Sequence, residues 1–286
     1  YQSGNSQSVP DENRQIVLRL VPGPDNPRNS EGSFITLKDG RILFIYSHFT
    51  GTSSGDFGHA YLAGRYSYDR GKTWDEKSHP VIGQEGLTNV MSVSLLRLRN
   101  GNIALFYLRK NSDTDCIPMM RISNDEAETW SDPVSCIPDR KGYFVLNNDR
   151  VIQLKNKRLV VPVSLHQTPG DSVFNKKGRI FCYYSDDNGQ TWKSGEEVPN
   201  PHGVLLQEPG IIALKNEKLF MFLRTAQGVP YVSYSGDNGE TWSPVKPGHI
   251  VSPFSPASVP RIPDTGHWLL VWHNQGNDQN RTPLTI

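Results

Sequence analysis

The stretch SDDNGQTW, residues 185–192, decides the fold because it recurs three more times along the chain. Ser stands first, Asp third, Thr seventh and Trp eighth in every copy, and the other copies are SYDRGKTW (67–74), SNDEAETW (123–130) and SGDNGETW (235–242). Successive repeat tryptophans lie 56, 62 and 50 residues apart. A repeat with this period predicts a solenoid or a propeller rather than a single closed sheet.

Each repeat unit also carries the same β-strand pattern. Two apolar runs flank a short polar turn in GSFITLKDGRILFIYS (32–47), VSLLRLRNGNIALFYL (93–108), RVIQLKNKRLVVPVSL (150–165) and GIIALKNEKLFMFLRT (210–225). Such segments predict β-hairpins. A third apolar run precedes each repeat and a shorter one follows it, so each unit has four strands, as a propeller blade does.

The residue types of the repeat have a structural explanation. The Asp can accept hydrogen bonds from turn amides, the Gly allows a positive φ, the Thr can cap the turn, and the Trp can pack between neighbouring blades. A turn that recurs in every blade does not mark one site. We therefore expect the repeat aspartates to be structural: Asp69, Asp125, Asp187 and Asp237.

These repeats are similar to the Asp boxes of the sialidase superfamily, which the chain resembles along nearly its whole length. The resemblance implies an all-β fold, a six-bladed β-propeller of the sialidase type. We expect residues 1–286 to form a single β-propeller domain with four clear blades and most of a fifth. The family's nucleophile, a tyrosine of the following blade, has no match here, so the end of the propeller is expected to lie beyond residue 286.

Composition limits the kinds of partner. The 286 residues are 36% hydrophobic, enough for a packed core, and carry a formal net charge of only +1. The small charge argues against nucleic-acid binding, and no apolar stretch is long enough to span a membrane.

The polar start, YQSGNSQSVPDENRQ, resembles that of a mature exported protein, so we expect a secreted or periplasmic location. Cys116 and Cys136 could meet, but buried unpaired thiols are the expected state.

Blade topology predicts which residues share a face. The start of the first strand and the end of the second lie at one rim of an antiparallel blade, and the repeat turn lies at the other rim. Strand counting, together with the loops that follow second strands, places a ring of polar residues at the first rim: Glu31, Asp56, His59, Ser92, Asn148, His166, Glu208, Arg224 and Arg281. Such a ring is typical of a pocket for a polar ligand.

The resemblance to sialidases is specific at four of these positions. QEPGIIALKNEKLFMFLRT (207–225) is similar to the fourth-blade segment of the family, which implies active-site roles for Glu208 and Arg224. NRTPLTI (280–286) looks like the segment that supplies another arginine of the carboxylate-binding triad, here Arg281. SGDFGH (54–59) resembles the mobile loop that bears the acid/base aspartate, here Asp56.

The first blade departs from the family pattern. Sialidases open this blade with an Arg-Ile-Pro segment, whereas this chain has SEGSF, so Glu31 stands where the first triad arginine is expected. An arginine fork binds both oxygens of a carboxylate, and a glutamate would repel it. Arg28 lies three residues away, but a fork displaced along the strand would not keep the bidentate geometry. We therefore expect weak or absent activity on ordinary sialosides.

Three classes of function remain open: a glycoside hydrolase that acts from the end of a glycan, a non-catalytic carbohydrate-binding propeller, and a scaffold. The first is favoured, with a glycan or small sugar as the partner. No compact His/Asp motif has metal-ligand spacing, so we expect no catalytic metal and no cofactor. Asp56 and Glu208 are the expected catalytic pair, and the expected sugar-binding residues are Glu31, His59, Asn148, Arg150, Arg224 and Arg281.

Overall fold

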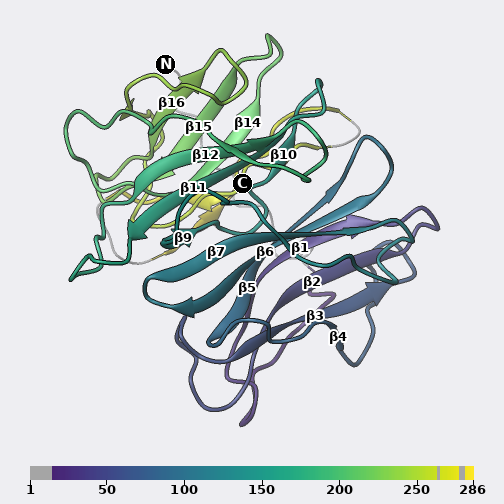
Figure 1. Cartoon of the computed structure of the whole chain (residues 1–286). Coiled ribbons are helices and arrows are strands. Elements are labelled where there is room, and N and C mark those ends of the chain that lie inside the picture. The colour runs from purple at the N-terminus through teal and green to yellow at the C-terminus, as the bar shows by residue number, and fades with distance from the viewer. Residues whose placement is uncertain (1–14, 263–264, 277–280) are drawn as a thin grey trace.

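The structure is a computed structural model that describes residues 15–262, 265–276 and 281–286 (Figure 1). Its regular elements are all β-strands, and no helix occurs among the described residues. The all-β class predicted from the sequence is therefore confirmed. The polar start that suggested export falls almost wholly in residues 1–14, which lie outside the described residues.

The first sheet has the strand order β1-β2-β3-β4, with all neighbours antiparallel. The β1–β2 turn closes with a hydrogen bond from the Leu37 amide to the Arg41 carbonyl, and Gly40 takes a φ of 89° there. A glycine suits this position because it has no Cβ to clash at positive φ. The strands are β1 (Asn29–Thr36), β2 (Ile42–Phe49), β3 (Ala60–Ser67) and β4 (His79–Ile82).

The second and third sheets are joined by a single parallel pairing between Cys116 and Tyr143. The second sheet contains β5 (Asn89–Arg97), β6 (Ile103–Ser112), β7 (Asp115–Ser123) and β8 (Val134–Ser135). The third contains β9 (Tyr143–Val145), β10 (Ile152–Gln153), β11 (Leu159–Gln167), β12 (Arg179–Ser185) and β13 (Lys193–Ser194).

The third sheet differs from the predicted pattern in its innermost strand. The sequence predicted one strand entering the hairpin of residues 150–165, but two short strands, β9 and β10, both pair with β11. Between them Asp149 adopts a left-handed φ of 56°, which ends the extended run. The break matters because the main chain at this point contacts the innermost strand of the second sheet, where the Asp149 amide donates to the Val93 carbonyl at 3.0 Å.

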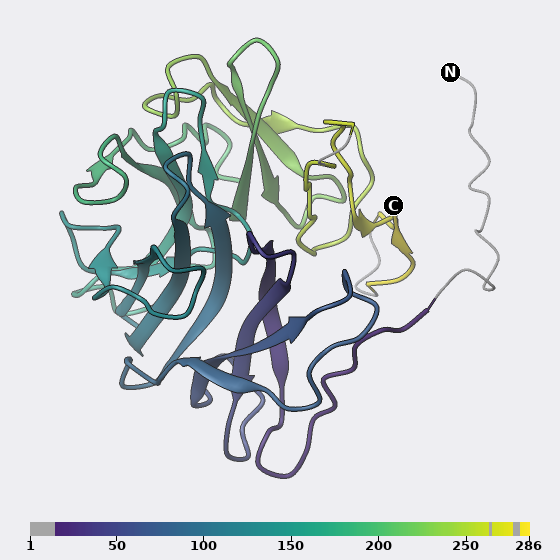
Figure 2. The same ribbon diagram turned by 90° about the vertical axis from the view of Figure 1, so that its right-hand side faces the viewer.

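The fourth sheet repeats the order of the first, with β14 (Gln207–Ala213), β15 (Leu219–Arg224), β16 (Tyr231–Ser235) and β17 (Lys246–Pro247). The C-terminal segment forms a smaller pair, β18 (Trp272–His273) with β19 (Leu284–Thr285), extended by isolated bridges. Figure 2 shows the chain passing around an arc, from purple through teal and green to yellow.

The hydrophobic core lies between successive sheets. Adjacent residues of a strand point to opposite faces, so Leu105 of β6 packs towards the first sheet and Phe106 packs towards the third. A third cluster joins the third and fourth sheets through residues such as Val160 and Met221. Cys116, Cys136 and Cys182 are buried free thiols, as the sequence predicted for all three cysteines.

The Asp-box turns are built alike in all four copies. The carboxylate of Asp187 accepts hydrogen bonds from the Thr191 amide (2.9 Å), the Thr191 hydroxyl (2.6 Å) and the Ser185 hydroxyl (2.7 Å). In the first copy, the Thr73 amide and hydroxyl lower the pKa of Asp69 to about 2. These contacts hold the turn closed, in line with a structural role.

The sequence predicted that the tryptophans of the boxes pack between neighbouring sheets. This is so for Trp192 and Trp242, which follow an earlier sheet in the chain. Trp192 is buried and lies edge-on to Phe106 of the second sheet, with ring centroids 6.3 Å apart. Trp242 joins the cluster shared with the third sheet. Trp74 instead lies edge-on to Phe34 and Phe44 of its own sheet.

Candidate functional site

One cavity of about 220 Å³ collects polar residues from all four sheets. Within β3, Ala60 pairs with Phe49 beside the loop of residues 50–59, while Ser67, which begins an Asp box, pairs with Ile42 at the opposite end. The cavity is therefore at the end of the strands away from the Asp boxes. Its lining is Glu31, Asp56, Met91, Ser92, Leu108, Lys110, Tyr143, Val145, Asn147, His166, Phe174, Gln207, Glu208 and Arg224.

A β-bulge in the innermost strand presents a side chain to this cavity from three of the sheets. The antiparallel register shifts within β1, β5 and β14, and the bulged residues Glu31, Ser92 and Glu208 have φ values of 54°, 62° and 47°. A left-handed conformation costs a residue with a side chain about 1–3 kcal/mol and is concentrated at functional sites. The bulges re-aim these three side chains towards the cavity.

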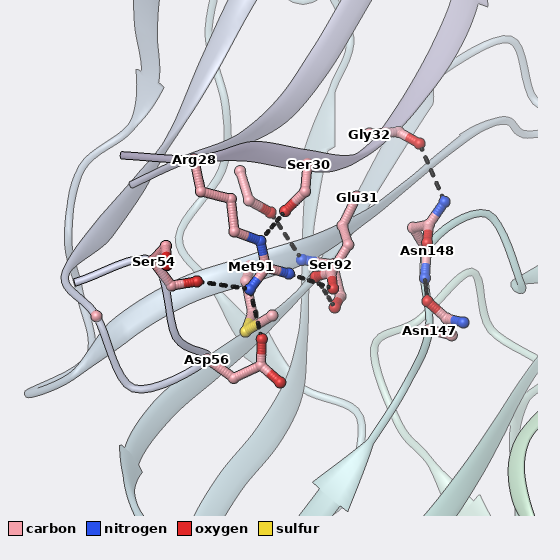
Figure 3. Close-up of polar contacts among 12 residues, drawn as sticks. Arg28, Ser30, Glu31, Gly32, Ser54, Asp56, Met91, Ser92, Asn147 and Asn148 are labelled. Carbon is pink, nitrogen blue, oxygen red and sulfur yellow. Dashed lines mark hydrogen bonds and ion pairs between the residues drawn. The ribbon is translucent and has the colours of Figure 1, made fainter. Parts of the chain in front are cut away.

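Arg28 connects two of the cavity carboxylates (Figure 3). Its Nη1 donates to Oδ1 of Asp56 at 2.6 Å and its Nη2 donates to Oε1 of Glu31 at 3.0 Å. The other oxygen of Glu31 accepts a hydrogen bond from the Ser92 hydroxyl at 2.8 Å. Arg28, which the sequence did not predict as a site residue, thus belongs to the site as a partner of Glu31 and Asp56.

The electrostatics of Glu31 are set mainly by burial. Burial raises the pKa of Glu31 above its ordinary value, and the Ser92 hydrogen bond and the charge of Arg28 oppose that rise. The negative charges of Asp56 and Glu208 add to the rise, because a nearby like charge disfavours the ionised form of Glu31. A carboxyl group in such a setting takes up a proton more readily than a solvated glutamate does.

Glu208 and Arg224 form the opposite side of the cavity. Arg224 Nη1 donates to Glu208 Oε1 at 2.6 Å, and the guanidinium lies 3.8 Å from the ring centroid of Phe254. Both side chains are largely buried, at 18% and 13% exposure. Among the described residues no donor reaches the buried Oε2 of Glu208. An unpaired buried carboxylate oxygen is costly, so this atom is ready to accept a hydrogen bond from a bound molecule.

The two remaining arginines lie close to this side of the cavity. Burial lowers the pKa of Arg224, the carboxylate of Glu208 opposes this, and the positive charge of Arg281 adds to it. Arg281 is exposed, and its Nη2 lies 3.5 Å from the Phe254 carbonyl oxygen. Arg150 is buried, donates to the Ala257 carbonyl at 2.5 Å and does not line the cavity.

Of the six predicted sugar-binding residues, only Glu31 and Arg224 line the cavity. Besides Arg150 and Arg281, Asn148 and His59 also lie outside the lining. Asn148 donates to the Gly32 carbonyl at 3.3 Å, and its neighbour Asn147 lines the cavity in its place. Strand counting missed this by one residue because the innermost strand breaks at Asp149, and a shift of one residue reverses the direction of a side chain. His59 is exposed and does not line the cavity, and its Nδ1 lies 3.1 Å from the Thr88 carbonyl oxygen.

Sequence reasoning missed a group of aromatic residues at one side of the cavity, of which Tyr143, His166 and Phe174 belong to its lining. Phe57 and Phe174 flank Tyr143, with ring centroids 6.2 and 5.4 Å from it, and His166 stacks on Phe174 at 4.9 Å. Phe57 and Phe174 are exposed. The signal that could have found Phe57 is its position directly after Asp56. Aromatic faces beside carboxylates suit a sugar ring, which has apolar faces and a polar edge.

The structure adds two observations on cofactors and membranes. Within residues 15–262, 265–276 and 281–286, no three His, Cys, Asp or Glu side chains are grouped closely enough to hold a metal ion. The same part of the chain contains no helix with the length and apolar character needed to cross a bilayer.

Comparison with known proteins places the chain among sialidase-like proteins. Residues 84–286 match the family described as BNR repeat-like domain. The chain is 24% identical over 246 residues to a sialidase of Paraclostridium sordellii, covering 76% of this chain and 57% of that protein. It is 26% identical over 189 residues to an anhydrosialidase of Macrobdella decora, covering 62% of this chain and 22% of that protein. The chain thus spans well under two thirds of these relatives.

Solved structures show the same fold. A protein of unknown function from Dyadobacter fermentans superposes with a TM-score of 0.71 at 20% identity, covering 88% of this chain and 76% of that one. A leech intramolecular trans-sialidase in complex with 2,7-anhydro-Neu5Ac superposes with a TM-score of 0.70 at 16% identity, covering 92% and 58%. The all-β architecture is therefore similar to that of sialidase β-propellers.

Proposed function

Because the chain belongs to the BNR repeat-like domain family of the sialidase superfamily, we propose that it is a glycoside hydrolase that acts from the end of a glycan. The proposal depends on one observation: Asp56, Glu31 and Glu208 gather around a single cavity in which Glu208 Oε2 has no partner among the described residues. Hydrolysis of a glycosidic bond needs two carboxyl groups with different tasks, one to donate a proton and one to support the attack.

In the proposed mechanism Asp56 is the general acid and Glu208 is the base or activator. The side chain of Asp56 is 62% exposed on a loop, so it can reach the glycosidic oxygen of a sugar that enters from solvent. Glu208 is held by Arg224, and its free oxygen accepts the proton of the attacking hydroxyl or water. The leaving group takes its proton from Asp56, so one proton is donated and one is accepted.

The remaining contacts set the choice of sugar. Glu31 accepts hydrogen bonds from sugar hydroxyls or excludes a carboxylate at its position, so a sugar without that carboxylate is preferred. Arg224 and Arg281 bind polar substituents at the other side. The roles that the sequence predicted for His59, Asn148 and Arg150 remain proposals that require a bound sugar to bring these residues into contact.

Three features of the whole protein belong to the same proposal. We take the arc of sheets to follow sixfold propeller symmetry, with residues 1–286 in a single domain. Packing of each sheet on the next, through clusters shared by neighbours, supports one cooperative unit. A secreted or periplasmic location, where glycans are met, completes the proposal.

A screen of aryl glycosides against the full-length protein tests the proposed function. Release of the aryl group from a glycoside, together with its loss in the Asp56→Asn variant, supports the proposal. An intact protein that binds sugars but hydrolyses none of them would instead be a carbohydrate-binding propeller.

That second candidate is favoured by one contact. Arg28 occupies Oδ1 of Asp56 at 2.6 Å, which leaves only Oδ2 to face a glycosidic oxygen. In a binding protein this ion pair would serve as a fixed wall of the pocket. In a hydrolase, Oδ2 must be the atom that carries the proton.

A further inference from the structure

The main-chain carbonyl of Asp56 receives two hydrogen bonds from the neighbouring sheet. Lys110 Nζ, at the end of β6, donates to this oxygen at 2.7 Å, and Asn89 Nδ2, at the start of β5, donates to it at 2.9 Å. Both side chains are buried, with exposures of 1% for Lys110 and 0% for Asn89. Two buried donors on one loop carbonyl give the loop a fixed anchor, which a solvated turn would not have.

The surroundings of Lys110 can accommodate an ammonium group whose hydrogen bond goes to the Asp56 carbonyl. Its Nζ lies 4.6 Å from the ring centroid of Phe57 and 5.3 Å from that of Tyr143, and it approaches the sulfur of Met91 at 3.6 Å. Burial lowers the pKa of Lys110, as expected for an ammonium group removed from water. Ring faces and a carbonyl compensate part of that cost.

The same loop is held at two further points. Asn89 Nδ2 also donates to the Gly58 carbonyl at 2.7 Å, and Arg28 holds the Asp56 carboxylate. A Cβ at position 58 would lie 2.5 Å from the Ser53 carbonyl, so the loop closes tightly on itself here. Arg28 Nη1 also donates to the Ser54 carbonyl at 3.3 Å, so the loop of residues 50–59 is held on both sides of Asp56.

We propose that Lys110 and Asn89 form a clamp that positions the β2–β3 loop, residues 50–59, so that the Asp56 side chain is already directed into the cavity before a sugar binds. Lys110 and Asn89 are positioning residues, since they act through Asp56 and not on the substrate. This inference extends the proposed function, because Asp56 is the proton donor there. The loop is then a fixed part of the site and not a lid that closes on the ligand.

Hydrogen exchange of the ligand-free protein tests the clamp without reference to catalysis. In Lys110→Met, which keeps the length and the packing against the rings, amides of residues 50–59 should exchange at least about tenfold faster than in the wild type. The control is Lys246→Met, because Lys246 also lies over an aromatic ring, that of Tyr234 at 5.5 Å, but belongs to β17 in the fourth sheet. Unchanged exchange of the loop in Lys110→Met would overturn the proposal.

Kinetics then separate positioning from direct contact with the sugar. Misplacement of a catalytic group by about 1 Å can cost roughly a hundredfold in rate. Lys110→Met should therefore lower kcat by about ten- to a hundredfold with little change in KM, whereas a rise in KM alone would show a substrate contact and refute positioning. Asn89→Ala provides a second variant if Lys110→Met does not fold, and it should give the same pattern in both measurements.

The two proposals fail in different ways. If no glycoside is hydrolysed by the wild-type protein, the proposed function fails, while faster exchange of the loop in Lys110→Met still supports the clamp. If hydrolysis is found but Lys110→Met and Asn89→Ala leave both exchange and kcat unchanged, the clamp fails and the proposed function stands.

Discussion

Arg28 Nη1 lies 2.6 Å from Asp56 Oδ1, so the β2–β3 loop is tied to the start of the first sheet by an ion pair at the cavity. The same guanidinium holds Glu31 at 3.0 Å, and one cation therefore serves two carboxylates. This arrangement compensates for the glutamate at position 31, which would otherwise face Asp56 without an intervening positive charge. Arg28 thus controls the charge of this side of the cavity.

Replacing Arg28 should change the titration of Glu31. The charge of Arg28 lowers the pKa of Glu31, against the larger effect of burial, so Arg28→Met should raise that pKa further. NMR titration of the glutamate carboxyl carbons measures the shift. The control is Arg97→Met, because Arg97 forms a similar pair with Glu126 at 2.7 Å away from the cavity. An unchanged titration of Glu31 in Arg28→Met would contradict this account.

Asp56→Asn should lower the rate of glycoside hydrolysis by roughly two to four powers of ten, the usual contribution of a positioned acid. The amide keeps the shape of the side chain and the loop contacts made by the main chain, so sugar affinity and Tm should change little. Steady-state kinetics, calorimetric binding and thermal melting check the three parts. Full activity in this variant would remove Asp56 from the mechanism.

Glu31 should make stability depend on pH in a predictable direction. Its pKa in the folded protein is raised above 4.5, so the folded state favours the protonated form. The corresponding stabilisation is complete below pH 4.5 and is lost as the pH rises through the raised pKa. Glu31→Gln should therefore gain stability relative to the wild type as the pH increases.

Urea unfolding at a series of pH values measures this gain. Ser92→Ala serves as the comparison, because it removes the hydroxyl that lowers the pKa of Glu31 and should steepen the loss of stability with pH. A difference between Glu31→Gln and the wild type that stays constant with pH would show that Glu31 titrates alike in both states.

Glu208 and Arg224 should be strongly coupled in stability. Removing one partner of a buried pair leaves an uncompensated charge and costs about 3–5 kcal/mol, so Arg224→Met should be severely destabilised. The double variant Glu208→Gln/Arg224→Met should recover much of that loss, because no buried charge remains. Denaturant unfolding of the single and double variants gives the coupling. Equal stabilities of Arg224→Met and the double variant would argue against it.

Ordinary α-sialosides should be poor substrates for the full-length protein. Glu31 stands at the cavity where the superfamily resemblance implied an arginine, and a glutamate repels the carboxylate of sialic acid. A fluorogenic sialoside compared with aryl glycosides of neutral sugars measures the preference. Efficient release from the sialoside would show that Arg28 or another cation takes over the missing role.

The sequence by itself determined the fold class and the content of its units. Each Asp box specifies its own turn through contacts within eight residues, such as Ser185 and Thr191 to Asp187, and these need no distant partner. Continuous apolar runs specify strands that bury both faces, as the adjacent residues Leu105 and Phe106 do. Strand counting also brought Glu31, Glu208 and Arg224 to one rim, because a hairpin fixes which ends of its strands meet.

Only the tertiary structure decided which atoms face one another in the cavity. A bulge or a break of one residue redirects a side chain, so Asn147 and not Asn148 lines the cavity. Lys110 and Tyr143 come from strands whose sequence is typical of a buried core. The role of Lys110 could not be predicted, because it depends on a contact with Asp56, which is 54 residues away along the chain. Local patterns carry no information on such contacts, since they form only when separate sheets pack together.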